Sequence, residues 1–495
     1  MKEYLMALDQ GTTSSRCIIF RRDGTVAASA AKELTQYFPR EGWVEHDAKE
    51  IFDSEVKVAK LALSKAGLTA ADIAAIGITN QRETTVVFEK ESGAPVCPAI
   101  VWQCRRTAAD CEALRRAGYT PLIREKTGLP IDPYFSATKL SYILDHVPDA
   151  RRRAERGELL FGTVDSYLIY RLTGGRVHAT DPTNASRTLL FDIHKLAFDE
   201  ELLKLFRIPA SMLPEVRPSA GFFGETDPAL FGAPIPITGV AGDQQAALFG
   251  QGCFAPGDLK NTYGTGAFLL MNTGEKAIFS ESGLLTTVAF QTKNEVNYAL
   301  EGSVFVCGAA IQWLRDGLGI LQNAAESETL AASVPDSGGV YFLPAFVGLG
   351  TPYWNPDVRG TIFGIGRGTR RAHLVRATLE AMALQTADVM DIMQKETGLT
   401  PGVLRVDGGA AANRLLLSLQ SDFSGVTVRR PACVETTAFG AAALAGLSAG
   451  VYRDKAEIAA LLHADAEFHP TLSPAGRKEK LSQWHKALNA AISFS

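Results

Sequence analysis

The sequence predicts an α/β protein made of two related lobes. Apolar runs with strand spacing alternate with amphipathic runs along the chain, an order typical of α/β proteins. Two strand–turn–strand units of similar character stand far apart, one near residue 10 and one near residue 265. The 495 residues suffice for two large domains. Glycines and a proline between residues 250 and 257 mark the expected boundary, so the lobes should span residues 1–252 and 253–495.

The first elements are a β-hairpin and a helix. Tyr4–Leu8 and Cys17–Phe20 are short apolar runs on either side of a polar, glycine-bearing turn, which predicts two antiparallel strands. Asp47 then begins a helix, with Glu50 three residues later as the expected partner in a capping box. Apolar residues recur at helical spacing after it, and Gly67 ends the helix.

Further strands are predicted in both lobes. Residues 73–79 and 84–88 are apolar runs that predict buried strands in the first lobe. Residues 235–240 predict a further strand, which leads into a Gly-Asp-Gln sequence. In the second lobe, residues 259–263 and 268–271 bracket a Gly-Thr-Gly turn and predict a second hairpin.

Helices dominate the last third of the chain. Residues 374–384 carry apolar side chains at helical spacing, and a strand at 404–406 leads through a glycine turn into a helix over 413–423. Residues 436–452 form a long uncharged run, but these 17 residues are mostly small. Because a bilayer core is about 30 Å thick, this run predicts a close-packed internal helix instead of a membrane span.

Composition excludes several classes of protein. Fifty Lys and Arg against 54 Asp and Glu give a formal charge of −4, which argues against a generally basic nucleic-acid binder. With 46% hydrophobic and 21% charged residues the chain is globular, not disordered. The seven cysteines include no C-x-x-C pair, and the N-terminus lacks the pattern of a signal peptide. We expect a cytoplasmic protein with no integral membrane segment and no nucleic-acid partner.

The turn after the first strand has the composition of a phosphate-binding loop. Thr12, Thr13 and Ser14 place hydroxyls and backbone N–H groups in a small concavity that suits phosphate oxygens. Arg16 adds positive charge, and Asp9 at the strand end can hold Mg²⁺, usually through its waters. An ordinary hairpin turn remains an alternative at this point.

Two further turns favour a nucleotide clamped between the lobes. Gly264-Thr265-Gly266 lies between two strands, where glycines permit close approach of the backbone. Residues 407–413 join a strand to a helix through small side chains, which leave a slot where an adenine or ribose could lie. Each turn alone has a plain connection as its alternative, which for Gly264-Thr265-Gly266 is the favoured interpretation, but together the turns describe a phosphate cradle in each half and a nucleoside slot in the second.

Polar residues at predicted strand ends offer the rest of a transfer site. Asp243 follows a strand and could accept a proton from a hydroxyl nucleophile. Arg82 and Glu83 supply one donor fork and one acceptor for adjacent hydroxyls. Trp102 and Tyr134 offer an apolar wall and a phenol. The alternatives are ordinary ion-paired charges and core aromatic residues.

These motifs resemble those of the FGGY family of carbohydrate kinases, and the resemblance covers nearly the whole chain. It implies two actin-like (ribonuclease H-like) domains with ATP in the cleft between them. Its most specific segments are Leu8–Arg16, Thr79–Thr85, Val101–Arg106, Pro133–Lys139, Gly242–Gln245, Asn261–Gly266 and Phe363–Ile365.

Roles carry over from the family to matching positions of this sequence. The resemblance implies substrate contacts at Arg82, Glu83, Trp102, Tyr134, Asp243, Gln244 and Phe268. It implies ATP contacts at Thr12, Thr13, Ser14, Arg16, Thr265, Gly308, Gln312, Gly409 and Asn413. Asp243 resembles the general base of the family.

The likeness is closest to the glycerol-phosphorylating branch of the family. It implies ATP- and Mg²⁺-dependent conversion of glycerol to sn-glycerol 3-phosphate, the first step of glycerol catabolism, in a homodimer or homotetramer. A kinase for another polyol or a ketose such as xylulose is the alternative within the family. An actin-like ATPase is the alternative outside the family, although such a protein has no need of side chains that bind a polyol.

Overall fold

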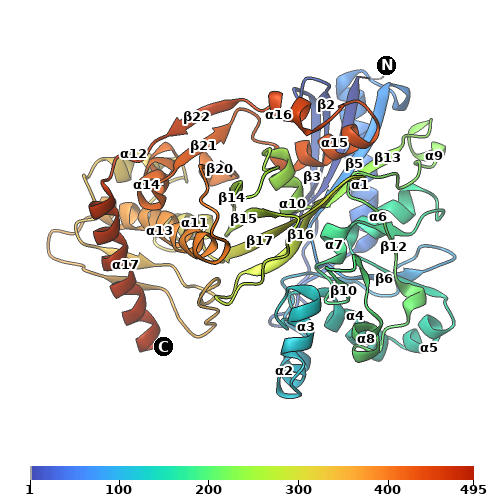
Figure 1. Ribbon diagram of the computed structural model, residues 1–495, viewed down its shortest axis with the longest axis horizontal. Helices are drawn as coiled ribbons and strands as arrows, with labels where there is room; N and C mark the ends of the chain where they lie inside the picture. The colour runs from blue at the N-terminus through green and yellow to red at the C-terminus, as the bar shows by residue number, and fades with distance from the viewer. Residues whose placement is uncertain (1–2) are drawn as a thin grey trace.

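The computed structural model describes residues 3–495 and contains two large mixed β-sheets, one in each lobe (Figure 1). In the first sheet β1 pairs antiparallel with β2 and parallel with β5, and β13 lies parallel to β5. Its strand order is β13-β5-β1-β2-β3. The strands are β1 (Tyr4–Gln10), β2 (Ser14–Arg21), β3 (Val26–Glu33), β5 (Ile73–Asn80) and β13 (Ile237–Gly242).

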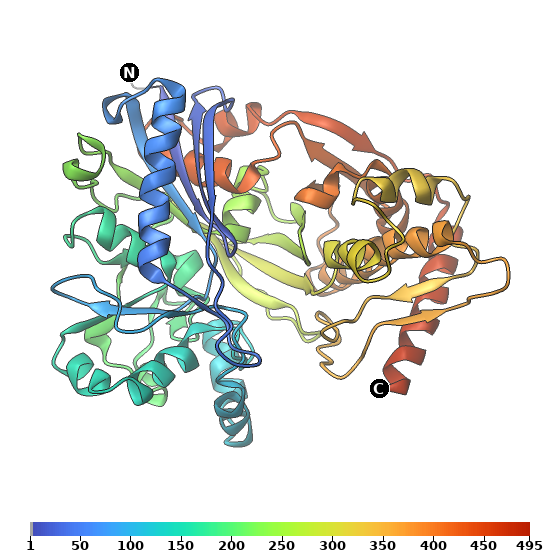
Figure 2. The same ribbon diagram turned by 180° about the vertical axis from the view of Figure 1, so that it is seen from behind.

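Helix α1 (Ala48–Ala66) packs on β2 and β3 (Figure 2). Asp47 caps it by accepting a hydrogen bond from the backbone N–H of Lys49, and Gly67 ends it in the left-handed conformation with φ 66°. The predicted helix is therefore confirmed. The predicted capping box is wrong, because the Glu50 carboxylate accepts a hydrogen bond from Thr35 at 3.3 Å instead.

A helix from the end of the chain covers the other face of the first sheet. Helix α15 (Thr436–Ser448) packs on β1, β5 and β13, and in Figure 1 this red helix lies within the blue and green lobe. It also crosses α10 (Asp243–Gly250) closely: a Cβ on Gly440 would lie 1.8 Å from the carbonyl oxygen of Ala246. The uncharged run is thus the close-packed internal helix that was predicted, and it joins the two lobes.

The second sheet forms the centre of the other lobe, in the order β16-β17-β15-β14-β20-β21-β22. The predicted second hairpin is confirmed, since β14 and β15 pair antiparallel. The strands are β14 (Leu259–Tyr263), β15 (Ala267–Gly274), β16 (Leu285–Gln291), β17 (Val296–Val304), β20 (Val403–Asp407), β21 (Thr427–Pro431) and β22 (Ala464–Phe468).

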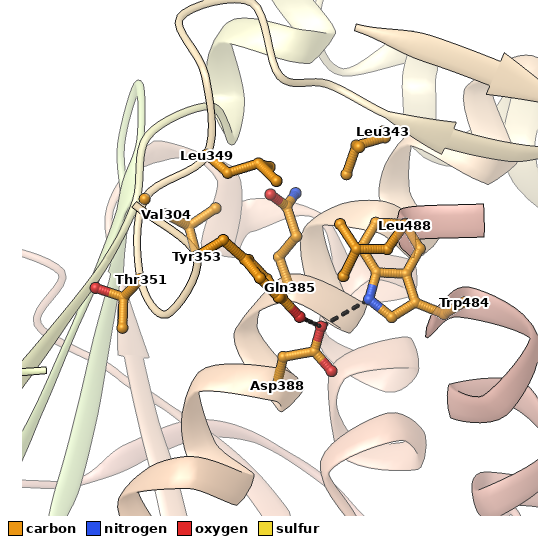
Figure 3. A pocket seen from close by; sticks show the side chains of 10 residues that line it. Val304, Leu343, Leu349, Thr351, Tyr353, Gln385, Asp388, Trp484 and Leu488 are labelled. Carbon is orange, nitrogen blue, oxygen red and sulfur yellow. Dashed lines mark hydrogen bonds between the residues drawn. The ribbon is translucent and has the colours of Figure 1, made fainter. Parts of the chain in front are cut away.

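Long helices pack on this sheet and on one another. The predicted helix over 374–384 is part of α13 (Arg371–Thr397), which packs against α14 (Arg414–Ser424). Helix α17 (Pro474–Phe494) is fastened to α13 by the buried carboxylate of Asp388, which accepts a hydrogen bond of 2.7 Å from the Trp484 indole (Figure 3). The lobe also contains α11 (Gly308–Asp316), α12 (Glu326–Ala332), β18 (Tyr341–Leu343) and β19 (Thr361–Phe363). Helix α16 (Lys455–Ala460), like α15, packs on the first lobe, where Ile458 belongs to one apolar cluster with Leu5 and Phe20.

A long insertion of short helices, short strands and loops separates β5 from β13 in the first lobe. Strand β6 begins at Val86 instead of Thr84, because Glu83 has a φ of 60° and the backbone turns there before it extends. The insertion, with the short β4 that precedes β5, contributes β4 (Glu45–His46), β6 (Val86–Glu89), β7 (Ala99–Ile100), α2 (Ala108–Arg116), α3 (Thr120–Thr127), α4 (Ser136–His146), α5 (Ala150–Glu155), β8 (Leu159–Gly162), α6 (Val164–Leu172), β9 (Ala179–Thr180), α7 (Pro182–Ala185), β10 (Phe191–Asp192), β11 (Ala197–Phe198), α8 (Glu200–Leu205), β12 (Glu215–Val216) and α9 (Pro228–Phe231).

Within residues 3–495 none of the helices combines the length and apolar character that crossing a bilayer requires. All seven cysteines are unpaired thiols. The domain boundary at 252/253 stays a prediction.

Candidate active site

Three predicted site segments meet at one edge of the first sheet. Strands β1, β5 and β13 run parallel, and Gln10, Asn80 and Gly242 lie side by side at their carboxyl ends. The hairpin turn after β1, the loop after β5 and Asp243 after β13 therefore lie close together. This arrangement follows from the general tendency of open α/β sheets to place ligands beyond the carboxyl ends of their strands.

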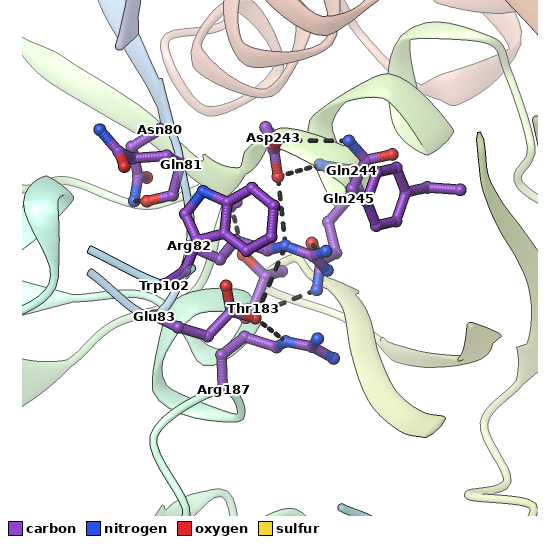
Figure 4. Close-up of polar contacts among 12 residues, drawn as sticks. Asn80, Gln81, Arg82, Glu83, Trp102, Thr183, Arg187, Asp243, Gln244 and Gln245 are labelled. Atoms are coloured by element: carbon purple, nitrogen blue, oxygen red, sulfur yellow. Dashed lines mark hydrogen bonds and ion pairs between the residues drawn. The ribbon is translucent and has the colours of Figure 1, made fainter. Parts of the chain in front are cut away.

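The Asp243 carboxylate is held in place but remains accessible. Its Oδ1 accepts a hydrogen bond of 2.8 Å from the backbone N–H of Gln244 and lies 3.1 Å from Nε of Arg82. The side-chain amide of Gln244 donates to Oδ2 at 3.2 Å. About a third of the side chain (34%) is exposed, so an incoming hydroxyl can reach it (Figure 4).

Arg82 belongs to a buried network of charges that joins the two lobes. Its Nη1 and Nη2 donate to the two carboxylate oxygens of Glu301 at 2.5 and 3.1 Å, and Glu301 comes from β17 of the second lobe. Arg187 donates to the same carboxylate at 3.2 Å and to Glu83 at 2.6 Å. All four side chains are at most 3% exposed.

The two arginines keep Glu301 ionised. Burial alone raises the pKa of a carboxyl group, but Arg187 and Arg82 outweigh it and hold the pKa of Glu301 at about 2. Burial raises the pKa of Glu83, against the opposing effect of Arg187 and Arg82. Because the four charged side chains contact one another, a change in the protonation of one alters the pKa values of the others.

Sequence reasoning missed Glu301 and Arg187. Each is a single charged residue within an otherwise uncharged segment, at 296–304 and 182–191 respectively. A lone charge in an apolar run was the available signal, because buried charges in proteins are normally paired.

The aromatic residues stand beside the Arg82 loop. Trp102 and Tyr134 pack edge to face with ring centroids 5.4 Å apart, and both are half-buried. The indole N–H of Trp102 donates a hydrogen bond of 2.9 Å to the hydroxyl of Thr12. A predicted wall of the substrate pocket thus directly contacts a predicted phosphate-binding residue.

A buried lysine connects the remaining substrate-side residues. Nζ of Lys260, on β14, donates to the side-chain oxygen of Gln244 at 2.5 Å and to the carbonyl oxygen of Phe268 at 3.3 Å. Burial lowers the pKa of this lysine to about 8, with Asp407 and Asp243 opposing the shift. Gln244 and Phe268, predicted from opposite lobes, are therefore brought together.

The first phosphate hairpin is a tight turn closed by its own backbone, with Gly11 N–H donating to the Ser14 carbonyl at 2.9 Å. Thr13 is exposed at its tip. Arg16 contacts Glu435 of the second lobe at 2.5 Å and lies 3.9 Å from Asp9. The sequence did not indicate Glu435, whose contact adds a link between the lobes.

The second hairpin rests on the start of α11. Backbone N–H of Gly308 donates to the carbonyl of Gly264 at 3.0 Å, and a Cβ on Gly308 would lie 2.5 Å from that oxygen. Thr265 is exposed at the turn, and Gln312 is exposed one helical turn along α11. These predicted ATP contacts therefore share one surface.

The predicted nucleoside slot adjoins the second hairpin. Gly408 has a φ of 85°, and a Cβ there would lie 2.4 Å from the carbonyl oxygen of Tyr263, just before the hairpin turn. Gly409 is exposed, and Asn413 caps α14 by accepting a hydrogen bond from Leu416 N–H. All the segments predicted for the nucleotide are thus placed in two neighbouring groups, one on each lobe.

The acidic residues at the cleft suit a magnesium ion. Burial raises the pKa of Asp9 to about 7; Arg16 opposes this shift, whereas Asp243 and Glu435 add to it. A carboxylate so disfavoured in its charged form gains from a nearby cation. Among residues 3–495 no group of three or more His, Cys, Asp or Glu is arranged to hold a metal. Mg²⁺ typically takes one or two protein carboxylates together with waters and substrate phosphates, and Asp9 supplies one such carboxylate.

Comparisons with known proteins agree with this geometry. Residues 4–250 match the N-terminal domain model, and residues 259–449 the C-terminal domain model, of the FGGY family of carbohydrate kinases. The chain is 57% identical over 492 residues to glycerol kinase 2 of Thermotoga maritima, covering 99% of each chain. It is 56% identical over 495 residues to the glycerol kinase of Bacillus subtilis, covering 100% of each.

A solved structure confirms the fold class. The crystal structure of Plasmodium falciparum glycerol kinase with ADP superposes with a TM-score of 0.93 at 34% identity, covering 99% of this chain and 98% of that one. The expected α/β fold of two actin-like domains is therefore confirmed.

Proposed function

The chain belongs to the FGGY family of carbohydrate kinases, and from this premise we propose that it transfers the γ-phosphoryl group of ATP to glycerol. The product is sn-glycerol 3-phosphate. One observation carries the proposal: an accessible carboxylate, Asp243, lies 3.1 Å from Arg82 at the strand edge that also bears the first phosphate hairpin. The relatives named above support glycerol as the acceptor.

In this proposal glycerol lies between Arg82, Glu83 and the Trp102 wall. The guanidinium donates to one hydroxyl and the Glu83 carboxylate accepts from another. The indole covers the carbon chain. The third hydroxyl then faces Asp243, beside the phosphate hairpin that Trp102 contacts through Thr12.

Phosphoryl transfer requires mainly positioning and charge stabilisation. The glycerol oxygen attacks the γ-phosphorus in line as the bond to the bridging oxygen of ADP breaks. Asp243 accepts the hydroxyl proton late in the reaction, as the nucleophile becomes more acidic. The products are sn-glycerol 3-phosphate, ADP and a proton, which leaves from Asp243.

The hairpin turns would hold the phosphate chain from both lobes. Thr12, Thr13 and Ser14 offer donors from the first lobe and Thr265 from the second. Asp9 would hold Mg²⁺ through its waters, and the ion offsets charge on the β- and γ-phosphates when bound. Contacts across the lobes, such as Arg16 with Glu435, help to exclude water that would otherwise hydrolyse ATP.

A substrate panel tests the proposal. The purified protein with Mg-ATP is offered glycerol, dihydroxyacetone, xylulose and gluconate in a coupled ADP assay. We expect glycerol to give the highest kcat/KM. Preference for xylulose or gluconate would assign the chain to another substrate of the same family, and equal ADP release without any acceptor would indicate an actin-like ATPase. A homodimer or homotetramer and a cytoplasmic location stay predictions.

A further inference from the structure

We propose that Glu301 of the second lobe is a positioning residue that fixes the Arg82 side chain. It thereby sets how strongly the enzyme discriminates against substrates that lack the hydroxyl bound by Arg82. The proposal rests on the proposed function. It concerns a residue that reaches the substrate only through Arg82. Glu301 differs in this respect from the residues expected to line the glycerol pocket.

The hydrogen bonds of Arg82 leave it little freedom. A guanidinium carries five N–H donors in a fixed plane. Nε faces Asp243 at 3.1 Å, Nη1 donates to Glu301 and to the Gln245 side chain at 2.5 and 3.2 Å, and Nη2 donates to Glu301 at 3.1 Å. Three of the five N–H groups are thus hydrogen-bonded to protein, Nε faces the Asp243 carboxylate as an ion pair, and one N–H on Nη2 remains. Arg82 can therefore offer substrate a donor only in a direction that these contacts determine.

Glu301 is well placed to impose that direction. Its carboxylate engages both Nη atoms of Arg82, a fork geometry more specific than a single contact. The side chain is fully buried, and Arg187 holds the same carboxylate from the other side at 3.2 Å. Because the group stays ionised at neutral pH, it pairs with Arg82 as a full negative charge.

The strand that bears Glu301 adds rigidity. Strand β17 lies between β15 and β16, and Glu301 stands directly opposite Leu270 of β15. Side chains two residues apart on a strand share one face, so the predicted wall residue Phe268 lies on the same face as Glu301. One face of the second sheet thus carries both the predicted apolar wall of the substrate pocket, Phe268, and the carboxylate that holds Arg82, Glu301.

The key variant is Glu301→Gln, which keeps the shape and removes the charge. Two diols probe the hydroxyls separately: propane-1,2-diol lacks a terminal hydroxyl and propane-1,3-diol lacks the central one. One of these diols lacks the hydroxyl that Arg82 binds, and it leaves a buried N–H donor of Arg82 unpaired. The wild type should therefore have a much lower kcat/KM for this diol than for glycerol. In Glu301→Gln we expect the ratio of kcat/KM for glycerol to that for this diol to fall at least about tenfold. The ratio for the other diol should change less than about twofold, and so should the KM for ATP.

Two further variants keep the test decisive. Glu301→Asp retains the charge on a shorter arm and should give an intermediate ratio, and it decides the matter if Glu301→Gln does not fold. Glu295→Gln is the matched control, because it removes a partly exposed carboxylate, paired with Lys455 just before the same strand, and should change neither ratio.

The outcomes separate the two proposals. If the wild type does not phosphorylate glycerol, the proposed function fails. If the wild type is active but Glu301→Gln and Glu301→Asp leave both ratios unchanged, or lower both equally, Glu301 is a structural residue and the inference is overturned.

Discussion

The predicted substrate side and the predicted nucleotide side of the site are built in opposite ways. On the predicted substrate side, Arg82 and Glu83 are buried and ion-paired with Glu301 and Arg187. On the predicted nucleotide side, the contacts are exposed or half-buried residues of turns and helix starts, and backbone hydrogen bonds hold them, as at Gly308.

The free-energy cost of burying a charge explains the difference. A buried charge without a partner is strongly destabilising, so charges meant for small hydroxyls need permanent protein partners. Backbone N–H groups in an exposed turn can bond to water until phosphate oxygens replace it. Variants on the two sides should therefore differ in what they change, which gives several ways to test the contrast.

The largest expected effect lies where the two sides meet, at Asp243. Replacing Asp243 by Asn keeps the shape but removes the proton acceptor, so kcat should fall by about 10²- to 10⁴-fold. Isothermal titration should show that binding of ATP and of glycerol is retained. Near-normal turnover in this variant would refute the assignment of the base.

Arg82→Ala tests the substrate side. The KM for glycerol should rise far more than the KM for ATP, because the lost side chain lies on the predicted substrate side of the site. Removing one partner of a buried ion pair also costs about 3–5 kcal/mol of stability, and urea unfolding should show this loss. Equal changes in both KM values would argue against the division of the cleft into two sides.

Gly308→Ala makes the reciprocal test on the nucleotide side. The added Cβ would lie 2.5 Å from the Gly264 carbonyl oxygen, so the second hairpin has to shift. We expect the KM for ATP to rise by roughly tenfold to a hundredfold, equivalent to about 1.4–2.8 kcal/mol, with little change for glycerol. Gly402→Ala is a matched control, since no atom lies within 4 Å of its added Cβ and the residue is outside the predicted site. A larger effect on glycerol than on ATP would contradict the contrast.

The smallest effect is expected outside the cleft, at His485. Its Nε2 lies 2.7 Å from Asp388, and this hydrogen bond raises the pKa of His485, with Asp391 adding to the shift. A raised folded-state pKa gives stability that is complete below the unfolded value of about 6.5 and is lost as pH rises through the folded value.

Because the ring is 47% exposed, solvent limits the gain to under about 1 kcal/mol. His485→Gln should therefore lower the free energy of unfolding at pH 6 more than at pH 9, while both KM values stay unchanged. A shift of either KM would mean that the active site is coupled to the docking of α17 on α13.

Local patterns predicted a large part of this molecule. Both hairpins, α1 and the Asp243 turn depend on residues that are close in sequence, and all lie where expected. Thr84 and Thr85 suggested a strand, but the positive φ of Glu83 turns the chain first, and side-chain type does not show this.

Long-range partners could not be predicted in the same way. Arg82 and Glu301 are 219 residues apart, and Arg16 and Glu435 are 419 apart. A lone glutamate in an apolar strand shows that a partner must exist, but pattern alone does not identify it. The contribution of the second lobe to the substrate side became visible only in the folded chain.

A crystal structure with glycerol and ADP bound would test the central claim most directly. We predict that Arg82 keeps both contacts to Glu301, with glycerol against Arg82 and the nucleotide on the hairpin turns, so that the Asp243 carboxylate lies between them. A structure in which Arg82 leaves Glu301 to reach glycerol, or in which glycerol binds away from Asp243, would contradict the account.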